Sequence, residues 1–113
     1  MPDNDRIIAE RAFYLEGEDT GKPAVLFRLW RPYQSQNDWP RCRYELITKS
    51  DVQEREIPGV DGLDCIIGCL SMAGTTIAGW NESLFAGRLK WDASPEGGRG
   101  LGLPTIEDHW PHH

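Results

Sequence analysis

Apolar and polar residues alternate along three segments in the first half of the chain, which predicts three strands. In residues 6–16 the apolar side of the run is interrupted only by Arg11. Residues 23–32 are apolar on both faces, which indicates an interior strand that Pro32 ends. Residues 41–49 alternate cleanly and predict a half-buried strand. The apolar residues that share one side within each segment are Ile7, Ala9, Phe13 and Leu15, then Val25, Phe27 and Leu29, then Cys42, Tyr44 and Leu46.

Two weaker patterns predict short strands. Residues 51–59 alternate poorly and end at Pro58 and Gly59, which is typical of an edge strand. A second short strand is expected around residues 88–91. Residues 97–102 ("GGRGLG") show no hydrophobic period and are expected to form a loop.

A helical period over residues 62–80 predicts one long helix, with Asp61 as its N-cap. We expect one side of this helix to face the core and the opposite side to be free of charge. The expected core stripe is Leu63, Ile66, Ile67, Leu70, Gly74, Ile77 and Ala78, and the opposite side is Cys65, Gly68, Met72, Thr75, Thr76 and Gly79.

The uncharged opposite side suggests close contact with another surface, because a solvated helix face normally carries charged residues. The run from Cys65 to Asn81 is too short and too polar to span a membrane, so no membrane association is expected. The cover is either the C-terminal segment or, slightly preferred, a second chain that approaches through Gly68 and Met72. On this interpretation Gly68→Arg leaves the fold intact. The candidate binding residues on this side are Cys65, Gly68, Met72 and Thr76.

These elements predict an α+β fold in which an antiparallel sheet of four to five strands packs on one long helix. A chain of 113 residues is long enough for one core. We expect a single domain over residues 1–104. Residues 105–113 form either a short helical turn or a flexible tail.

Charge narrows the expected partners and location. The formal net charge of −6 disfavours a nonspecific partner that carries phosphate, so neither nucleic acid nor an anionic membrane is expected. The start of the sequence, "MPDNDR", has no apolar segment typical of a secretory signal. Three cysteines, an odd number, do not form a disulfide framework. We therefore expect a cytoplasmic protein with free thiols.

The residues typical of metal or catalytic sites do not form a specific motif. Cys65 and Cys69 stand four apart, but two thiolates without further spaced ligands do not make a zinc site, and Cys42 is expected in the core. The histidines lie in the last five residues, which argues against a catalytic triad. The glycine loop matches no phosphate-binding pattern. The three histidines of the chain are His109, His112 and His113. We therefore predict no metal, no cofactor and no catalytic residue.

Arginines on the predicted strands allow a second candidate surface. Arg28, Arg41 and Arg43 with Trp30 would form a sheet face able to stack bases or hold an acidic peptide. The alternative, which we favour, is pairing of the arginines with carboxylates on neighbouring strands. The carboxylates expected to take part are Glu10, Glu45 and Glu56.

Several segments resemble a known family: "IAERAFYL", "PAVLFRLWRP", "DWPRCRYEL", "GVDGLDCII", "LKW" and "GLGLP". Together they are similar to a family of small single-domain bacterial proteins known only as a domain of unknown function, over roughly residues 8–104. The resemblance implies a bacterial protein and no particular activity.

We therefore expect a noncatalytic protein-interaction module, which associates with itself or with another protein. The alternative is a small-molecule-binding protein or an enzyme that uses the arginine-rich sheet face or the glycine-rich loop.

Overall fold

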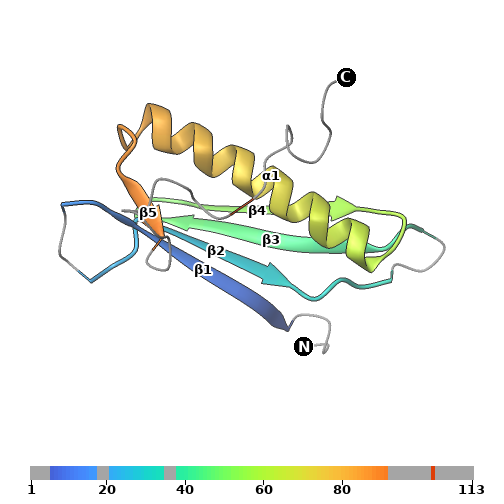
Figure 1. Ribbon diagram of the computed structural model, residues 1–113. Coiled ribbons are helices and arrows are strands. Elements are labelled where there is room, and N and C mark those ends of the chain that lie inside the picture. Colours follow the sequence, from blue (N-terminus) through green and yellow to red (C-terminus); the bar gives the residue numbers. More distant parts are fainter. Residues whose placement is uncertain (1–5, 18–20, 35–37, 92–102, 104–113) are drawn as a thin grey trace, which may run out of the picture.

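Five strands form one antiparallel sheet with a single helix against it in the computed structural model, which describes residues 6–17, 21–34, 38–91 and 103 (Figure 1). The strand order is β4-β3-β2-β1-β5. The elements are β1 (Ile7–Leu15), β2 (Val25–Trp30), β3 (Arg41–Thr48), β4 (Val52–Pro58), α1 (Gly62–Ser83) and β5 (Leu89–Trp91). The predicted α+β fold is confirmed.

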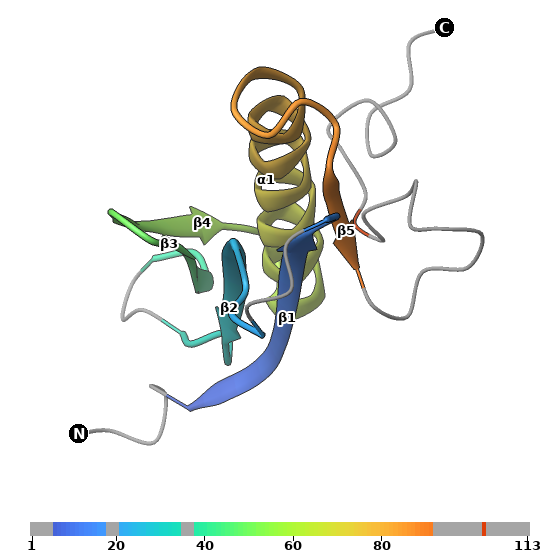
Figure 2. The same cartoon turned by 90° about the vertical axis from the view of Figure 1, so that its left-hand side faces the viewer.

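The first four strands form a meander, and α1 then carries the chain across one face of the sheet to β5 (Figure 2). β5 pairs with β1, so the two edges of the sheet are β4 and β5. Figure 2 shows the sheet twisted about α1, with β4 and β5 on either side of the helix. The described helix covers one face, which leaves the other face of the sheet without a helix in the described residues.

The pairing register confirms the predicted faces of β2 and β3. Leu29 lies opposite Tyr44 and Phe27 opposite Leu46, and all four side chains are buried beneath α1. The prediction for the start of β1 is wrong: Ala9 pairs with Leu29 but Ile7 pairs with Trp30. This irregularity is a β-bulge, which inserts an extra residue and interrupts the alternation of side chains.

The start of α1 follows the predicted capping chemistry. The Asp61 carboxylate accepts a hydrogen bond from the Asp64 N–H (2.8 Å), and the Asp64 carboxylate accepts one from the Val60 N–H (3.0 Å). These two bonds satisfy backbone donors that have no partner within the helix. The direction in which the chain enters α1 is thereby fixed.

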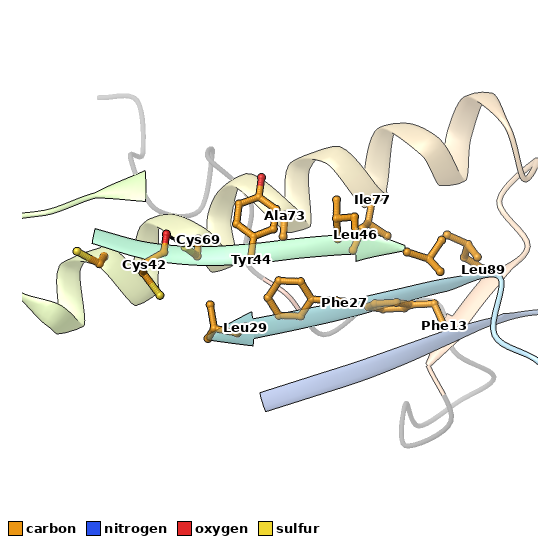
Figure 3. Packing of buried hydrophobic residues seen from close by; sticks show 12 residues of the cluster. Phe13, Phe27, Leu29, Cys42, Tyr44, Leu46, Cys69, Ala73, Ile77 and Leu89 are labelled. Atoms are coloured by element: carbon orange, nitrogen blue, oxygen red, sulfur yellow. Dashed lines mark hydrogen bonds between the residues drawn. The ribbon is translucent and has the colours of Figure 1, made fainter. Parts of the chain in front are cut away.

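The predicted orientation of α1 is only partly correct: Gly74 and Ile77 of the expected core stripe are buried, but so are Cys65 and Gly68 of the expected opposite side. Cys65, Gly68, Cys69 and Ala73, here called the small-residue seam, are buried, whereas Leu63 of the expected core stripe is exposed. The sheet supplies the large side chains at this contact (Figure 3). They include Phe27, Tyr44 and Leu46. Small helix residues let the helix backbone come close to a sheet face that already carries bulky groups.

Gly68 shows how close this approach is. A Cβ atom at Gly68 would lie 2.9 Å from Cγ2 of Ile57 on β4, which is shorter than a normal contact. The expectation that Gly68→Arg leaves the fold intact is therefore wrong, because position 68 lies between α1 and β4.

By length and composition, α1 would be able to cross a membrane, but the core helix of a soluble protein meets the same test. Here α1 packs along β3 and β4. The helix is therefore weak evidence for a membrane span.

The same substitution at two glycines of α1 should have different effects. Gly79 has open space around its missing Cβ, so Gly79→Ala should raise the free energy of unfolding by about 1 kcal/mol through helix propensity. Gly68→Ala gains the same propensity but forces Ile57 to move, so we expect it to be less stable than Gly79→Ala by about 1–3 kcal/mol. Urea unfolding of both variants measures the difference. Equal stabilisation would show that position 68 has room for a side chain.

Candidate functional site

The face of the sheet opposite α1, here called the outer face, carries side chains in rows across the strands. In one row Ala12 lies opposite Leu26, Leu26 opposite Ile47, and Ile47 opposite Val52. The next row is charged and contains Glu10, Arg28, Glu45 and Glu54 in the same order. The register also places the candidate residues Trp30, Arg41 and Arg43 on this face.

Carboxylates already pair with the three arginines of the candidate sheet-face set. The ion pairs join Arg28 Nε to Glu10 Oε2 (2.6 Å), Arg41 Nη2 to Asp38 Oδ2 (3.2 Å), Arg41 Nη1 to Glu56 Oε1 (3.8 Å) and Arg43 Nη1 to Glu54 Oε2 (3.4 Å). The favoured expectation of cross-strand pairing therefore holds for Glu10 and Glu56, whereas Arg43 pairs with Glu54. Pairing of this kind lowers the capacity of the face to bind an added anion.

Trp30 also has little surface left for a ligand. Its side chain is 7% exposed, and the Arg43 guanidinium lies 4.2 Å from the centre of its ring. This cation–π contact uses the ring face that a stacked base would need. The geometry therefore favours a structural role for Trp30 over base stacking.

The four candidate residues on the helix do not share one open surface. Cys65 and Gly68 are buried against the sheet, whereas Met72 is exposed and Thr76 is half-buried. The Thr76 hydroxyl donates to the Met72 carbonyl (3.0 Å), within the helix. The expected binding side of α1 is therefore divided between the core and solvent.

The three thiols are buried where β3 meets α1. Cys42 Sγ donates to the Trp30 carbonyl (3.1 Å), Cys65 Sγ to the Pro40 carbonyl (3.1 Å) and Cys69 Sγ to the Cys42 carbonyl (3.4 Å). Each thiol thus contacts a backbone carbonyl on the sheet side, and all three are free. Within the described residues, no group of three or more His, Cys, Asp or Glu side chains is arranged to hold a metal ion.

Burial favours the protonated form of Cys65 and Cys69, whereas the hydrogen bond with Cys69 lowers the pKa of Cys42. Desolvation raises the pKa of Cys65, and the hydrogen bond with Cys42 together with desolvation raises the pKa of Cys69. A protonated thiol is a poor nucleophile. The glycine-rich loop at residues 97–102 and the three histidines lie outside the described residues.

Sequence analysis missed an exposed apolar surface at one end of the molecule. Trp39, Val60 and Leu63, here called the terminal patch, are 59%, 67% and 66% exposed. Figure 1 shows that the β2–β3 connection, the β4–α1 connection and the start of α1 lie at the same end of the sheet; these segments carry Trp39, Val60 and Leu63 in turn. Trp39 lies between two predicted strands, where no element was predicted, and Leu63 belonged to the expected core stripe.

The backbone on both sides of the terminal patch is held by hydrogen bonds. The Gly59 N–H donates to the Pro40 carbonyl (3.0 Å), which joins the two backbone segments that carry Trp39 and Val60. A Cβ at Gly59 would lie 2.6 Å from the Cys65 backbone nitrogen, so only glycine allows residue 59 to lie this close to the first turn of α1. The apolar side chains therefore project from a fixed backbone.

The fold and these surfaces define a small α+β protein in which one helix covers one face of an antiparallel sheet. The chain belongs to the family described as Domain of unknown function (DUF6968), whose model matches residues 9–105. The comparisons with curated proteins and with solved structures give no match. The predicted resemblance to a family of unknown function is confirmed.

A double-mutant cycle should detect the Arg28–Glu10 pair. Reversing either charge leaves two like charges on neighbouring strands, and reversing both restores an attractive pair. Because both side chains are partly exposed, we expect a coupling of only about 0.2–1 kcal/mol, measured by urea unfolding of the four proteins. Additive effects of the two reversals would show that this contact does not contribute.

The thiols should be protected in the native protein. We expect Cys42, Cys65 and Cys69 to react with a thiol reagent at pH 8 far more slowly in buffer than in urea. Because the pKa of Cys65 and Cys69 is higher in the folded than in the unfolded chain, their contribution to stability is complete below about pH 8.5 and decreases as the pH rises further. Labelling kinetics and unfolding curves at several pH values test both points. Rapid labelling of all three thiols in buffer would contradict their burial.

Proposed function

We propose that this protein is a noncatalytic protein-interaction module that binds its partner through the terminal patch. The single observation that supports the proposal is the exposure of Trp39, Val60 and Leu63 together at one end of the fold. Tryptophan is among the residues that contribute most to the affinity of protein interfaces. Grouped exposed apolar residues are typical of interaction sites, whereas single ones need no explanation.

The fixed backbone of the terminal patch supports this function over a flexible loop tip. The Pro40 carbonyl accepts hydrogen bonds from both the Gly59 N–H and the Cys65 thiol. A binding surface that is already ordered loses less conformational entropy when a partner arrives. Rigid presentation of large apolar groups is therefore useful for binding and costly for solubility.

The alternative of a small-molecule-binding protein or enzyme that uses the arginine-rich face has less support. Arg28, Arg41 and Arg43 each contact a carboxylate. An anionic substrate would have to displace these partners before it gained an ion pair of its own.

The proposal includes self-association, in which the partner is a second copy of the same chain. A second copy would meet the terminal patch rather than Gly68, because Gly68 lies against Ile57. We also place the protein in a reducing compartment such as the cytoplasm, on the basis of its three free cysteines.

Partner capture with matched variants tests the proposal. Trp39→Ser and Leu63→Ser remove exposed apolar groups and should leave the fold intact, because neither side chain belongs to the buried core. We expect both variants to lose a partner that the unmodified protein recovers from cells, or to lose concentration-dependent association in sedimentation. Leu84→Ser is the control, since Leu84 is equally exposed but follows the other end of α1.

Two results would contradict the proposal. One is a partner or dimer that is retained equally by all three variants. The other is a monomer that recovers no partner.

A further inference from the structure

The open edge of β4 has the geometry of a strand-addition site. In the part of the chain that the structure describes, β4 is the last strand on its side of the sheet, and it pairs with β3 in an unbroken register over seven residues. The strand at the opposite edge, β5, has only three residues. β4 is therefore the longer edge on which another strand would find a regular template.

The pairing fixes which backbone groups of β4 face outward. The Thr48 N–H donates to the Asp51 carbonyl, and the Gly59 N–H donates to the Pro40 carbonyl. Hydrogen-bonded pairs alternate in an antiparallel ladder, so the odd-numbered residues of β4 bond to β3. The N–H groups of Glu54 and Glu56 consequently point to the open edge, as do the carbonyls of the even-numbered residues.

The side chains at this edge select the charge of an added strand. Glu45 lies directly opposite Glu54, so the charged row of the outer face ends at the edge with two adjacent carboxylates. Like charges in opposite positions are unfavourable, and Glu54 is still 52% exposed although Arg43 contacts it. A cationic side chain on the open side of Glu54 would relieve this repulsion, and one beside Glu56 would add to the contacts that this carboxylate makes with Arg41 and the Tyr33 hydroxyl.

A second copy of the chain fits this edge poorly. The fullest antiparallel overlap of two β4 strands would place Arg55 opposite Arg55 and Glu54 opposite Glu56. Both arrangements bring like charges together, which is a common way to prevent sheets from joining edge to edge.

We infer that β4 binds an extended segment of another protein, with basic side chains at alternate positions next to Glu54 and Glu56. This inference deepens the proposed function, because it gives the conformation and charge of the partner. The backbone of the segment bonds to the outward groups of Glu54 and Glu56. Its basic side chains continue the charged rows of the outer face, and its other side chains flank Arg55 on the opposite face.

The test uses a defined probe, a capped seven-residue peptide in which threonine and lysine alternate. We expect its addition to shift the amide signals of Glu54 and Glu56 in the NMR spectrum of the isotope-labelled protein. A peptide of the same composition with contiguous lysines should bind more weakly. The double variant Glu54→Gln, Glu56→Gln should lose about three- to tenfold in affinity at low salt.

Backbone pairing is tested separately from charge. Two peptides, each N-methylated at three amides taken from one or the other alternating set, have the same charge and composition. Only one of them should bind, because only one set of peptide N–H groups faces β4. In the protein, Glu54→Pro removes the outward N–H as well as the carboxylate without removing a bond to β3, so it should weaken binding far more than Glu54→Gln, which removes the charge alone.

Absence of binding to the alternating peptide, or equal binding of both methylated peptides, would overturn the inference. If Trp39-dependent capture of a partner persists in that case, the edge site is wrong and the proposed function stands. If the peptide binds while capture is independent of Trp39, the terminal patch is wrong and the edge site stands.

Discussion

The structure depends on the close contact between the small-residue seam of α1 and the large side chains of the sheet. Cys65, Cys69 and Ala73 are completely buried, and they face a sheet surface that carries Phe27 and Tyr44. The rings of these two aromatic residues lie 6.0 Å apart and are tilted with respect to each other. Because protein interiors are densely packed, large side chains on the sheet require small side chains at the facing positions of the helix. This match sets the distance of α1 from every strand.

The same contact positions the end of the molecule that carries the terminal patch. With α1 held close to β3, the Cys65 thiol reaches the Pro40 carbonyl, which also accepts the Gly59 N–H. One carbonyl oxygen thus links the segment before β3, the exit from β4 and the first turn of α1. The candidate interaction surface is therefore a consequence of how the core packs.

Sequence patterns predicted the parts of the fold that depend on local chemistry. The alternation in β2 and β3 and the N-cap at Asp61 were correct, because each depends on neighbouring residues or on a capping side chain. The orientation of α1 was correct for Gly74 and Ile77, but wrong for Leu63 and for Cys65 and Gly68 of the small-residue seam. The observed orientation of the helix depends on the volume that Tyr44 occupies on β3. The sequence of the helix alone gives no information about that volume.

Sequence patterns did not reveal the terminal patch for a related reason. Trp39 lies among polar residues, and its exposure beside Val60 results from a backbone contact between Pro40 and Gly59 across nineteen positions of sequence. On the arginine-rich face, Arg43 contacts Glu54 diagonally, although the register places it directly opposite Glu56. No local signal distinguishes those two carboxylates.

The path of α1 from one edge of the sheet to the other determines how the chain assembles. The strands from β1 to β4 pair with neighbours along the sequence, so each hairpin closes a short loop. β5 pairs with β1, from which it is separated in sequence by the rest of the meander and the helix, and this pairing places Phe13 opposite Trp91. Contacts between distant segments are slow to form because the loop-closure entropy has to be lost first. Closure of the sheet by β5 is therefore expected to be a late event in folding, with the meander formed before it.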